Sequence, residues 1–281
     1  MRISKATDQP GWLSKAIAIL TMLFLSLPLI AIVPVSFTSK RYLSMPDGIW
    51  SVRHYASLFT NPVWLDSIKT SLMIGVIVAI ISTTLAVLFG LGLWYVRSKL
   101  TIILSAIVFV PMLMPPVVSA IILYFFGIKV SGLLPFIGFD SVGGVIIAHV
   151  LLATPFSLVS FLVALSRVDR KLDMAARALG ATLSQSIMYI ILPNTKFGII
   201  TAALMAFILS WEEITVTLFI TSASVVTLPR EMWNGMRDNV DPAIAAISSI
   251  LIVFTIGAIL GRDLFVAART FRSGKRLANT R

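Results

Sequence analysis

The sequence has no cysteine and very few charged residues, which make up 12% of its 281 positions. Without cysteine the chain forms neither disulfides nor thiolate sites, and a zinc or iron–sulfur centre would have to rest on two histidines and scattered carboxylates. Soluble domains carry about 25% charged residues, whereas here 58% of residues are apolar. The composition therefore predicts a membrane protein without metal or cofactor.

The sequence also lacks the motifs of common enzyme classes. Gly274-Lys275 stands in a polar tail without the earlier glycine of a phosphate-binding loop, so the chain does not bind ATP in that way. Neither a Gly-x-Ser-x-Gly elbow nor a His-Glu-x-x-His helix occurs. A lone histidine in an apolar stretch, such as His149, is typical of a packed hydrogen-bonding side chain. We therefore expect a protein that is not an enzyme.

Six apolar stretches are long enough to span a bilayer, because about twenty helical residues cross a hydrocarbon core of roughly 30 Å. They are Leu13–Phe37, Ser67–Val96, Leu100–Gly127, Gly143–Ser166, Phe197–Thr221 and Pro242–Gly261. The predicted fold is an all-α bundle of six transmembrane helices over residues 13–262, with a short N-terminal segment (1–12) and a basic tail (263–281). The first stretch is too long for a cleaved signal peptide and is predicted to be a retained anchor.

Basic residues are divided unevenly between the two sides of this predicted bundle. Six spans place both termini on one side, and that side, with the 97–99 turn and the 167–196 loop, carries 16 of the 23 Lys and Arg residues. Because basic loops mark the cytoplasmic side, both termini and the 167–196 loop are predicted to be cytoplasmic. The net charge of +11 is then an orientation signal rather than a nucleic-acid footprint. The basic tail is predicted to meet anionic lipid headgroups or solvent.

Three prolines, Pro111, Pro115 and Pro116, interrupt the third stretch. Proline is tolerated in a membrane helix where neighbouring helices or water satisfy the freed carbonyl groups. One interpretation is a static kink, and the other is a bend beside a transport pathway. The clustering of three prolines in one span favours the second interpretation.

The 167–196 loop is polar, basic and rich in helix-forming alanine. In a first short helix, Ala176 and Gly180 are four residues apart and would present small side chains on one face. Gly180 is predicted to end or kink this helix, and a second helix is predicted over Leu183–Ile191, stopped by Pro193. Two short helices flat against a membrane would form a docking module for a cytosolic partner. An ordinary amphipathic loop is the alternative.

The run Ser210-Trp211-Glu212-Glu213 interrupts the otherwise apolar fifth stretch. Carboxylates inside a membrane usually face a cavity or a partner, and the direction of the span places this pair past the midplane, towards the outside. Ser210, Glu213 and Thr217 recur at helical spacing as part of one polar stripe, so Glu213 is predicted to face a pathway for a cation. Glu212 is predicted to support it or to contact a partner subunit, and Trp211 offers a cation–π face. Alternatively, both acids pair with an arginine of another chain.

The motif residues of the 167–196 loop are Ala175, Ala176, Gly180, Ile190, Leu192 and Pro193. Their spacing resembles the Glu-Ala-Ala loop of ABC importer permeases of the binding-protein-dependent type. The resemblance implies a type I importer permease fold, a non-catalytic role, and a loop that inserts into a cleft on a partner ATPase. Met174 stands where the family has glutamate. Asp173 is the adjacent candidate for the acidic contact, although one residue turns a side chain by about 100° around a helix.

A closer resemblance, to spermidine/putrescine permeases, extends over nearly the whole chain. Those permeases tend to carry Ser-x-Asp-Asp, a β-branched run, Phe and a downstream Leu-Pro. The corresponding residues here are Ser210-Trp211-Glu212-Glu213, Phe219 and Leu228-Pro229. An external basic-aromatic-tyrosine patch corresponds to Arg53-His54-Tyr55, with His54 where tryptophan is common.

The resemblance implies one transmembrane subunit of a bacterial inner-membrane importer for a small cationic solute, with polyamines as the leading class. Its implied partners are a dimer of ATP-binding subunits, a second permease subunit, a periplasmic solute-binding protein and membrane lipid, but no nucleic acid. An opine or amino-acid derivative is an alternative solute. A proton-coupled secondary transporter that uses Glu212 and Glu213 is the alternative of another class; it predicts inverted repeats, which the sequence does not show.

Overall fold

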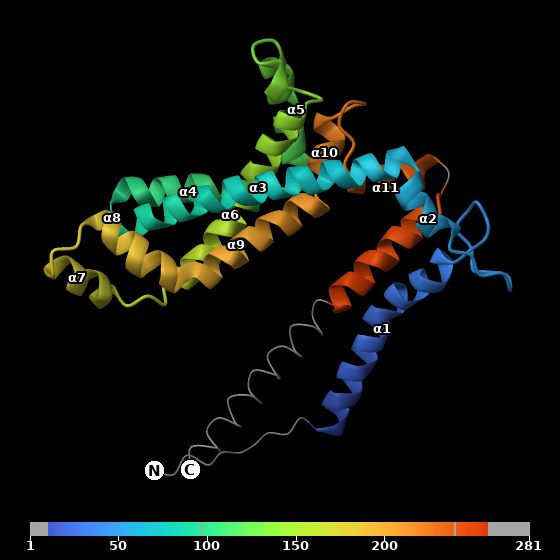
Figure 1. Ribbon diagram of the computed structural model, residues 1–281, viewed down its shortest axis with the longest axis horizontal. Coiled ribbons are helices and arrows are strands. Elements are labelled where there is room, and N and C mark those ends of the chain that lie inside the picture. Colours follow the sequence, from blue (N-terminus) through green and yellow to red (C-terminus); the bar gives the residue numbers. More distant parts are fainter. Residues whose placement is uncertain (1–10, 97, 239, 258–281) are drawn as a thin grey trace. The chain divides into compact units, whose positions relative to one another are not determined.

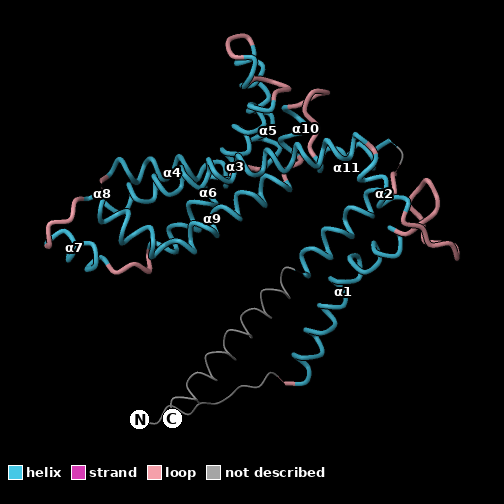
Figure 2. The backbone as a smooth tube through the Cα atoms, in the orientation of Figure 1, coloured by secondary structure: helices cyan, strands magenta, loops and turns pink. Residues whose placement is uncertain are grey.

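The computed structural model describes residues 11–96, 98–238 and 240–257, and the described residues form helices joined by loops, without a strand (Figures 1 and 2). The all-α prediction is therefore confirmed for these ranges. The chain divides into two compact units, one formed by Met1–Asn61 with Asn234–Arg281 and the other by Pro62–Trp233. Most of the predicted N-terminal segment 1–12, and all of the predicted tail 263–281, lie outside the described residues.

Among the described residues, four helical stretches are long and apolar enough to cross a membrane. They are α1 (Trp12–Ser36), α3 (Pro62–Tyr95), α6 (Val142–Leu165) and the stretch Leu183–Glu212, whose larger part is α9 (Leu192–Glu212). The pair α4 (Lys99–Leu113) and α5 (Pro116–Ser131) makes a fifth span if its two bent halves are counted together. An apolar helix at Ala243–Gly257 is shorter, and the end of the sixth predicted span lies beyond the described residues. Six spans are thus not confirmed.

The predicted third span is broken rather than kinked, because α4 and α5 meet at an angle of 107°. Met114 and Pro115 are both extended at this corner, with ψ angles of 141° and 136°. A residue that precedes proline is sterically disfavoured in the helical region, and Met114 and Pro115 each precede a proline. The Pro115-Pro116 pair thus ends one helix and begins the next, and Figure 1 shows α5 leaving the line of α4.

The core of the second unit is built from α3, α6 and α9, which pack against one another. Small residues allow this close approach: a Cβ atom added at Gly90 would lie 2.6 Å from the Phe161 ring, and one added at Gly198 would lie 2.1 Å from Cβ of Ala164. Membrane helices associate through such small-residue contacts because lipid supplies little hydrophobic driving force between them. Two clusters fill the core, one around Val78 and one around the fully buried Phe161.

Helix α10 (Thr215–Ile220) packs against α5, whereas α7 (Arg170–Ala178) follows α6 along the chain. The loop after α10 is held by Asp140, whose carboxylate accepts backbone N–H bonds from residues 222–224 at 2.7–3.3 Å. Partial burial raises the pKa of this carboxyl, but the backbone hydrogen bonds outweigh that effect and hold the pKa below its usual value. The guanidinium of Arg230 donates to Thr221 and to the carbonyl of Ser222 in the same loop.

In the first unit, α1 is joined to α2 (Arg53–Thr60) by a hydrogen bond of 2.6 Å between the hydroxyls of Ser36 and Tyr55. The Phe37 ring lies 5.1 Å from that of Tyr55. His54 is buried, and its Nε2 atom lies 2.9 Å from the carbonyl oxygen of Lys40. In this chain His54 therefore holds the turn between α1 and α2.

Candidate functional site

The predicted docking segment contains two short helices, as expected, and the first of them ends just before Gly180, which also agrees with the prediction. The helix α7 ends at Ala178, and Gly180 lies beyond it with a φ angle of +93°. The N–H groups of Gly180 and Ala181 bond back to the carbonyls of Arg177 and Ala176, which is the Schellman arrangement that favours glycine. The prediction that Ala176 and Gly180 share a helix face is therefore wrong, because Gly180 reverses the chain after the helix.

The second short helix continues into the membrane span instead of stopping at Pro193. Helix α8 (Leu183–Ser186) passes through a π-helical turn, η2 (Ile187–Ile191), directly into α9. Pro193 has no N–H to donate to the carbonyl group four residues earlier in an α-helix, and the π-helical turn at Ile187–Ile191 accommodates this missing hydrogen bond. The side chain of Asn194 donates to the carbonyl of Ile190 (2.7 Å), and Thr195 donates to that of Ile191 (2.9 Å). Pro193 is thus an interior residue of a longer helix, and the predicted stop is wrong.

Helix α7 contacts the last turn of α3 through two polar side chains. The guanidinium of Arg170 donates to the carbonyl of Trp94 (2.9 Å) and lies 4.3 Å from the centre of the Trp94 ring. The carboxylate of Asp173, only 8% exposed, accepts hydrogen bonds from the hydroxyls of Tyr95 (2.9 Å) and Ser186 (2.5 Å). The charge of Asp173 therefore faces into the chain, whereas the neighbouring Met174 is 59% exposed.

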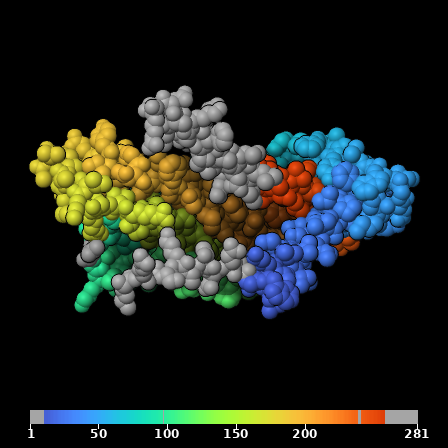
Figure 3. Space-filling model, turned by 90° about the horizontal axis from the view of Figure 1, so that it is seen from below, coloured from blue at the N-terminus to red at the C-terminus, as the bar shows by residue number. Residues whose placement is uncertain are grey.

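An apolar surface covers the outer side of the α7–α8 segment. Leu179 is 89% exposed at the tip, and Tyr189 is 78% exposed on the π-helical turn. The other exposed large apolar side chains of this surface are Leu172, Met174, Leu183 and Met188. Ala175 is exposed and Ala176 half-buried, and Ile190 and Leu192 are half-buried. In the space-filling view these yellow and gold segments lie on the surface (Figure 3). Of these side chains, Leu172, Met174 and Leu179 lie outside the stretch Leu183–Glu212 that is apolar enough to cross a membrane, and exposed apolar patches outside a membrane mark interaction sites.

The acidic run lies at a break in the predicted fifth span. Helix α9 ends at Glu212, Glu213 has an extended backbone (ψ 109°), and α10 starts at Thr215. The Glu213 carboxylate accepts the N–H of Val216 at 2.8 Å, so its charge stabilises the start of α10. The prediction of one continuous polar stripe is therefore wrong. Glu212 is exposed, whereas Glu213 and Trp211 are half-buried, and the Trp211 ring stacks on Phe207 with 5.8 Å between centroids.

His149 joins the two sides of this break. Its Nδ1 atom lies 2.9 Å from Oγ of Ser210 in α9, and its Nε2 atom lies 3.0 Å from Oγ1 of Thr217 in α10. Thr217 donates its single hydroxyl hydrogen to the carbonyl of Glu213 (3.1 Å). Thr217 therefore accepts from Nε2–H of His149, and Nδ1 accepts from Ser210. The packed, hydrogen-bonding role predicted for His149 is confirmed, since the residue is 1% exposed.

A cavity of about 210 Å³ lies where the two broken spans meet. Its lining from the α4–α5 corner is Pro111, Met112, Met114, Pro116 and Ser119. The other lining residues are His149, Leu152, Phe156, Leu209 and Glu213. The bend at the three prolines therefore adjoins a cavity that contains a carboxylate. No sequence signal placed His149 in this cavity; its position emerges only from the packing of α6 on the α9–α10 break.

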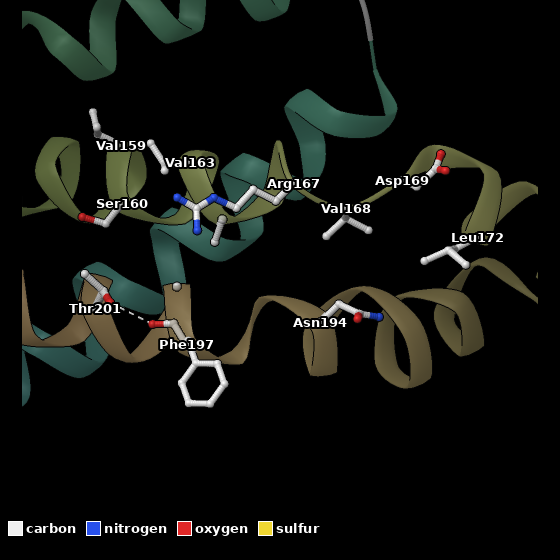
Figure 4. Close-up of a pocket in the computed structure, with 12 residues that line it drawn as sticks. Val159, Ser160, Val163, Arg167, Val168, Asp169, Leu172, Asn194, Phe197 and Thr201 are labelled. Carbon is white, nitrogen blue, oxygen red and sulfur yellow. Dashed lines mark hydrogen bonds between the residues drawn. The ribbon is translucent and has the colours of Figure 1, made fainter. Parts of the chain in front are cut away.

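A larger open groove of about 720 Å³ runs between the ends of α6 and α9 beside α7 (Figure 4). Its polar lining includes Arg167, Asp169 and Asn194, and its walls are valine and other apolar residues. In Figure 4 the Arg167 side chain extends back along α6 towards Val163. Among the described residues, no group of three or more His, Asp or Glu side chains is placed to hold a metal ion.

Comparison with known proteins gives a match over most of the chain. Residues 82–270 match the family described as binding-protein-dependent transport system inner membrane component. A spermidine/putrescine transport system permease protein of Haemophilus influenzae is 26% identical over 252 residues, which is 89% of this chain and 94% of that protein. A probable molybdenum ABC transporter permease protein of Haloferax volcanii is 32% identical over 225 residues, 78% of this chain and 83% of the other.

The fold is also similar to that of solved transporters. A bacterial ABC transporter involved in the import of the acidic polysaccharide alginate aligns with a TM-score of 0.67 at 18% identity, covering 90% of this chain and 94% of that one. At this identity the likeness concerns the fold alone.

Proposed function

The chain belongs to the family of binding-protein-dependent transport system inner membrane components, and we propose that it carries a small cationic solute, with polyamines as the leading class. It is a permease subunit of the ABC importer type, a non-catalytic component embedded in a membrane by several apolar helices. The resemblance noted from the loop motif is thereby confirmed at the level of the family.

The acidic cavity carries the substrate proposal. Glu213 lines the cavity at the two helix breaks, together with Ser119 and flexible methionines. A carboxylate has about four acceptor sites, so the bond from Val216 leaves capacity for an ammonium group. An anion would be repelled by Glu212 and Glu213, which are adjacent in the sequence. The spermidine/putrescine relative, similar along 89% of this chain, supports the same solute class.

Other solutes occur in the same family, since relatives include a probable molybdenum permease and the shared fold includes an alginate importer. An opine or amino-acid derivative with a free amino group would also suit a carboxylate and is the second candidate. The proton-coupled secondary transporter is disfavoured by family membership, because importers of this family depend on a binding protein.

The α7–α8 surface supports a docking role for the 167–196 loop. We propose that this surface, which includes Leu179 and Ala175, seats against an ATP-binding subunit that supplies the energy. A dimer of such subunits, a second permease subunit and a periplasmic solute-binding protein would complete the transporter in a bacterial inner membrane, with both termini of this chain in the cytoplasm. The basic residues on that side would then face anionic lipid.

The test compares Glu213→Gln with the matched variant Glu212→Gln in the assembled transporter. Glutamine keeps the side-chain oxygen that accepts the Val216 N–H, so α10 retains its capping bond while the charge is lost. A hydrogen bond to a charged group is worth about 1.5–3 kcal/mol, so we expect uptake of labelled spermidine or putrescine to fall by about ten- to hundredfold. Glu212→Gln should change uptake less, because Glu212 is exposed.

Competition distinguishes the solute classes. Unlabelled polyamines should compete with the labelled solute, whereas molybdate or an anionic sugar should not. Parental uptake in Glu213→Gln, or competition by the anion alone, would remove the basis for a cation pathway.

A further inference from the structure

Helix α7 is held by a buried carboxylate that connects it to two membrane spans at once. One oxygen of Asp173, Oδ1, accepts the hydroxyls of both Tyr95 and Ser186. Tyr95 is the last residue of α3, and Ser186 ends α8, which continues through η2 into α9. The three residues therefore join the docking segment to the ends of α3 and of the α8–α9 stretch.

These two spans reach from the docking segment to the acidic cavity. Helix α3 packs along both α6 and α9, and α9 leads to Ser210 and the Glu213 break. Packed helices move as rigid elements rather than deforming continuously. A displacement of α7 is thus passed to the core only if α7 is firmly attached to it, and Asp173 is a buried point of attachment.

We infer that Asp173 is a positioning residue that transmits movement of the docked α7 helix to α3 and α9. This inference rests on the proposed docking of an ATP-binding subunit at the α7–α8 surface. Asp173 does not itself contact the partner, because the residue is only 8% exposed and its carboxylate accepts hydrogen bonds from Tyr95 and Ser186. Arg170 adds a second attachment at Trp94, but it lies on the exposed side of α7.

The experiment uses the complete transporter, with its ATP-binding subunits, second permease and binding protein, in liposomes. Solute uptake and ATP hydrolysis are measured together for Asp173→Ala, Tyr95→Phe and Ser186→Ala. We expect the ATP-binding subunit to remain bound, while uptake per ATP hydrolysed falls by roughly tenfold in Asp173→Ala, which loses two hydrogen bonds to a charged acceptor. Tyr95→Phe and Ser186→Ala each remove one bond and should have smaller effects.

Two controls separate positioning from folding. Asp173→Asn keeps an oxygen that can accept both hydroxyls, so it should restore most of the uptake per ATP. Tyr124→Phe removes a hydroxyl from α5, outside the docking segment, and should leave the ratio unchanged. If Asp173→Ala fails to assemble, Tyr95→Phe and Ser186→Ala test the inference instead, again by the uptake per ATP hydrolysed.

The outcomes also separate this inference from the docking proposal. Parental uptake per ATP in Asp173→Ala, or in both single-hydroxyl variants if Asp173→Ala does not assemble, would overturn the inference while leaving docking intact. If the parental chain retains no ATP-binding subunit, or a variant with a charge at Leu179 binds it unchanged, the docking proposal itself fails.

Discussion

His149 offers a direct test of how the broken span is held together. Its ring is hydrogen-bonded to Ser210 of α9 and to Thr217 of α10, and Thr217 in turn donates to the carbonyl of Glu213. The substitution His149→Phe keeps an aromatic ring of similar volume while removing both hydrogen bonds. Any loss of stability then comes from the polar connection across the break rather than from an empty cavity.

The expected loss is modest but measurable. Hydrogen bonds between membrane helices average about 0.6 kcal/mol in double-mutant cycles, and those in soluble proteins contribute about 1 kcal/mol. Two such bonds give about 1–2 kcal/mol for His149→Phe. His149→Ala should cost about 2–3 kcal/mol more, because it also leaves a cavity among well-packed groups. Thr217 keeps its bond to the Glu213 carbonyl in both variants.

The assay is reversible unfolding of the purified chain in mixed micelles, combined with double-mutant cycles that pair His149→Phe with Ser210→Ala or with Thr217→Val. Each cycle should give a coupling of about 0.6–1 kcal/mol. Removing the partner hydroxyls in a triple variant should recover part of the stability lost by His149→Phe. If the losses of unfolding free energy in the single variants add up to that of the double variant within about 0.3–0.5 kcal/mol in both cycles, the His149 ring does not couple the two helices.

Two further predictions concern loops. At Gly180 the φ angle is +93° and an added Cβ would meet open space. Asn tolerates this left-handed backbone but the β-branched Val does not, so Gly180→Asn should retain capture of the ATP-binding subunit and Gly180→Val should lose it. Equal loss of capture in both variants would point to side-chain bulk instead, and equal retention would show that the backbone angle at Gly180 does not matter for docking. At Asp140 the folded pKa lies below the usual 3.8, so its stabilisation is present above about pH 4 and is lost as pH falls through the folded pKa. The melting temperature of Asp140→Asn should accordingly be lower than that of the parent at pH 7 and converge with it in acid, and a constant difference would contradict this assignment.

The sequence predicts much of the local structure of the 167–196 loop because the signals there are local. Two short helices and the helix end near Gly180 follow from propensity and spacing within one loop, whereas the exposed apolar side chains of this loop are known only from the structure. The errors there are also local. Pro193 was expected to stop a helix, but the π-helical turn at Ile187–Ile191 absorbs it, together with the side chains of Asn194 and Thr195. No propensity rule locates such a turn, because it depends on bonds that form only in the assembled helix.

The acidic cavity could be predicted only in part. An intramembrane carboxylate indicates a functional site whatever its neighbours, and the prolines indicate a bend. That the two coincide depends on how α6 packs against α9, which places His149 between Ser210 and Thr217. Contacts between residues more than sixty positions apart leave no trace in a single sequence.

The break and the acid at Glu213 are best understood as one feature. In an unbroken membrane helix the backbone N–H groups are all used, so a carboxylate would lack backbone partners and its burial would be costly. Ending α9 at Glu212 and starting α10 at Thr215 frees N–H groups at a helix start, and Glu213 accepts that of Val216. The broken span therefore makes a charged cavity wall tolerable within the membrane. The break therefore gives the Glu213 carboxylate a backbone partner at the wall of the cavity, and a carboxylate at that wall is what the proposed recognition of a cationic solute uses.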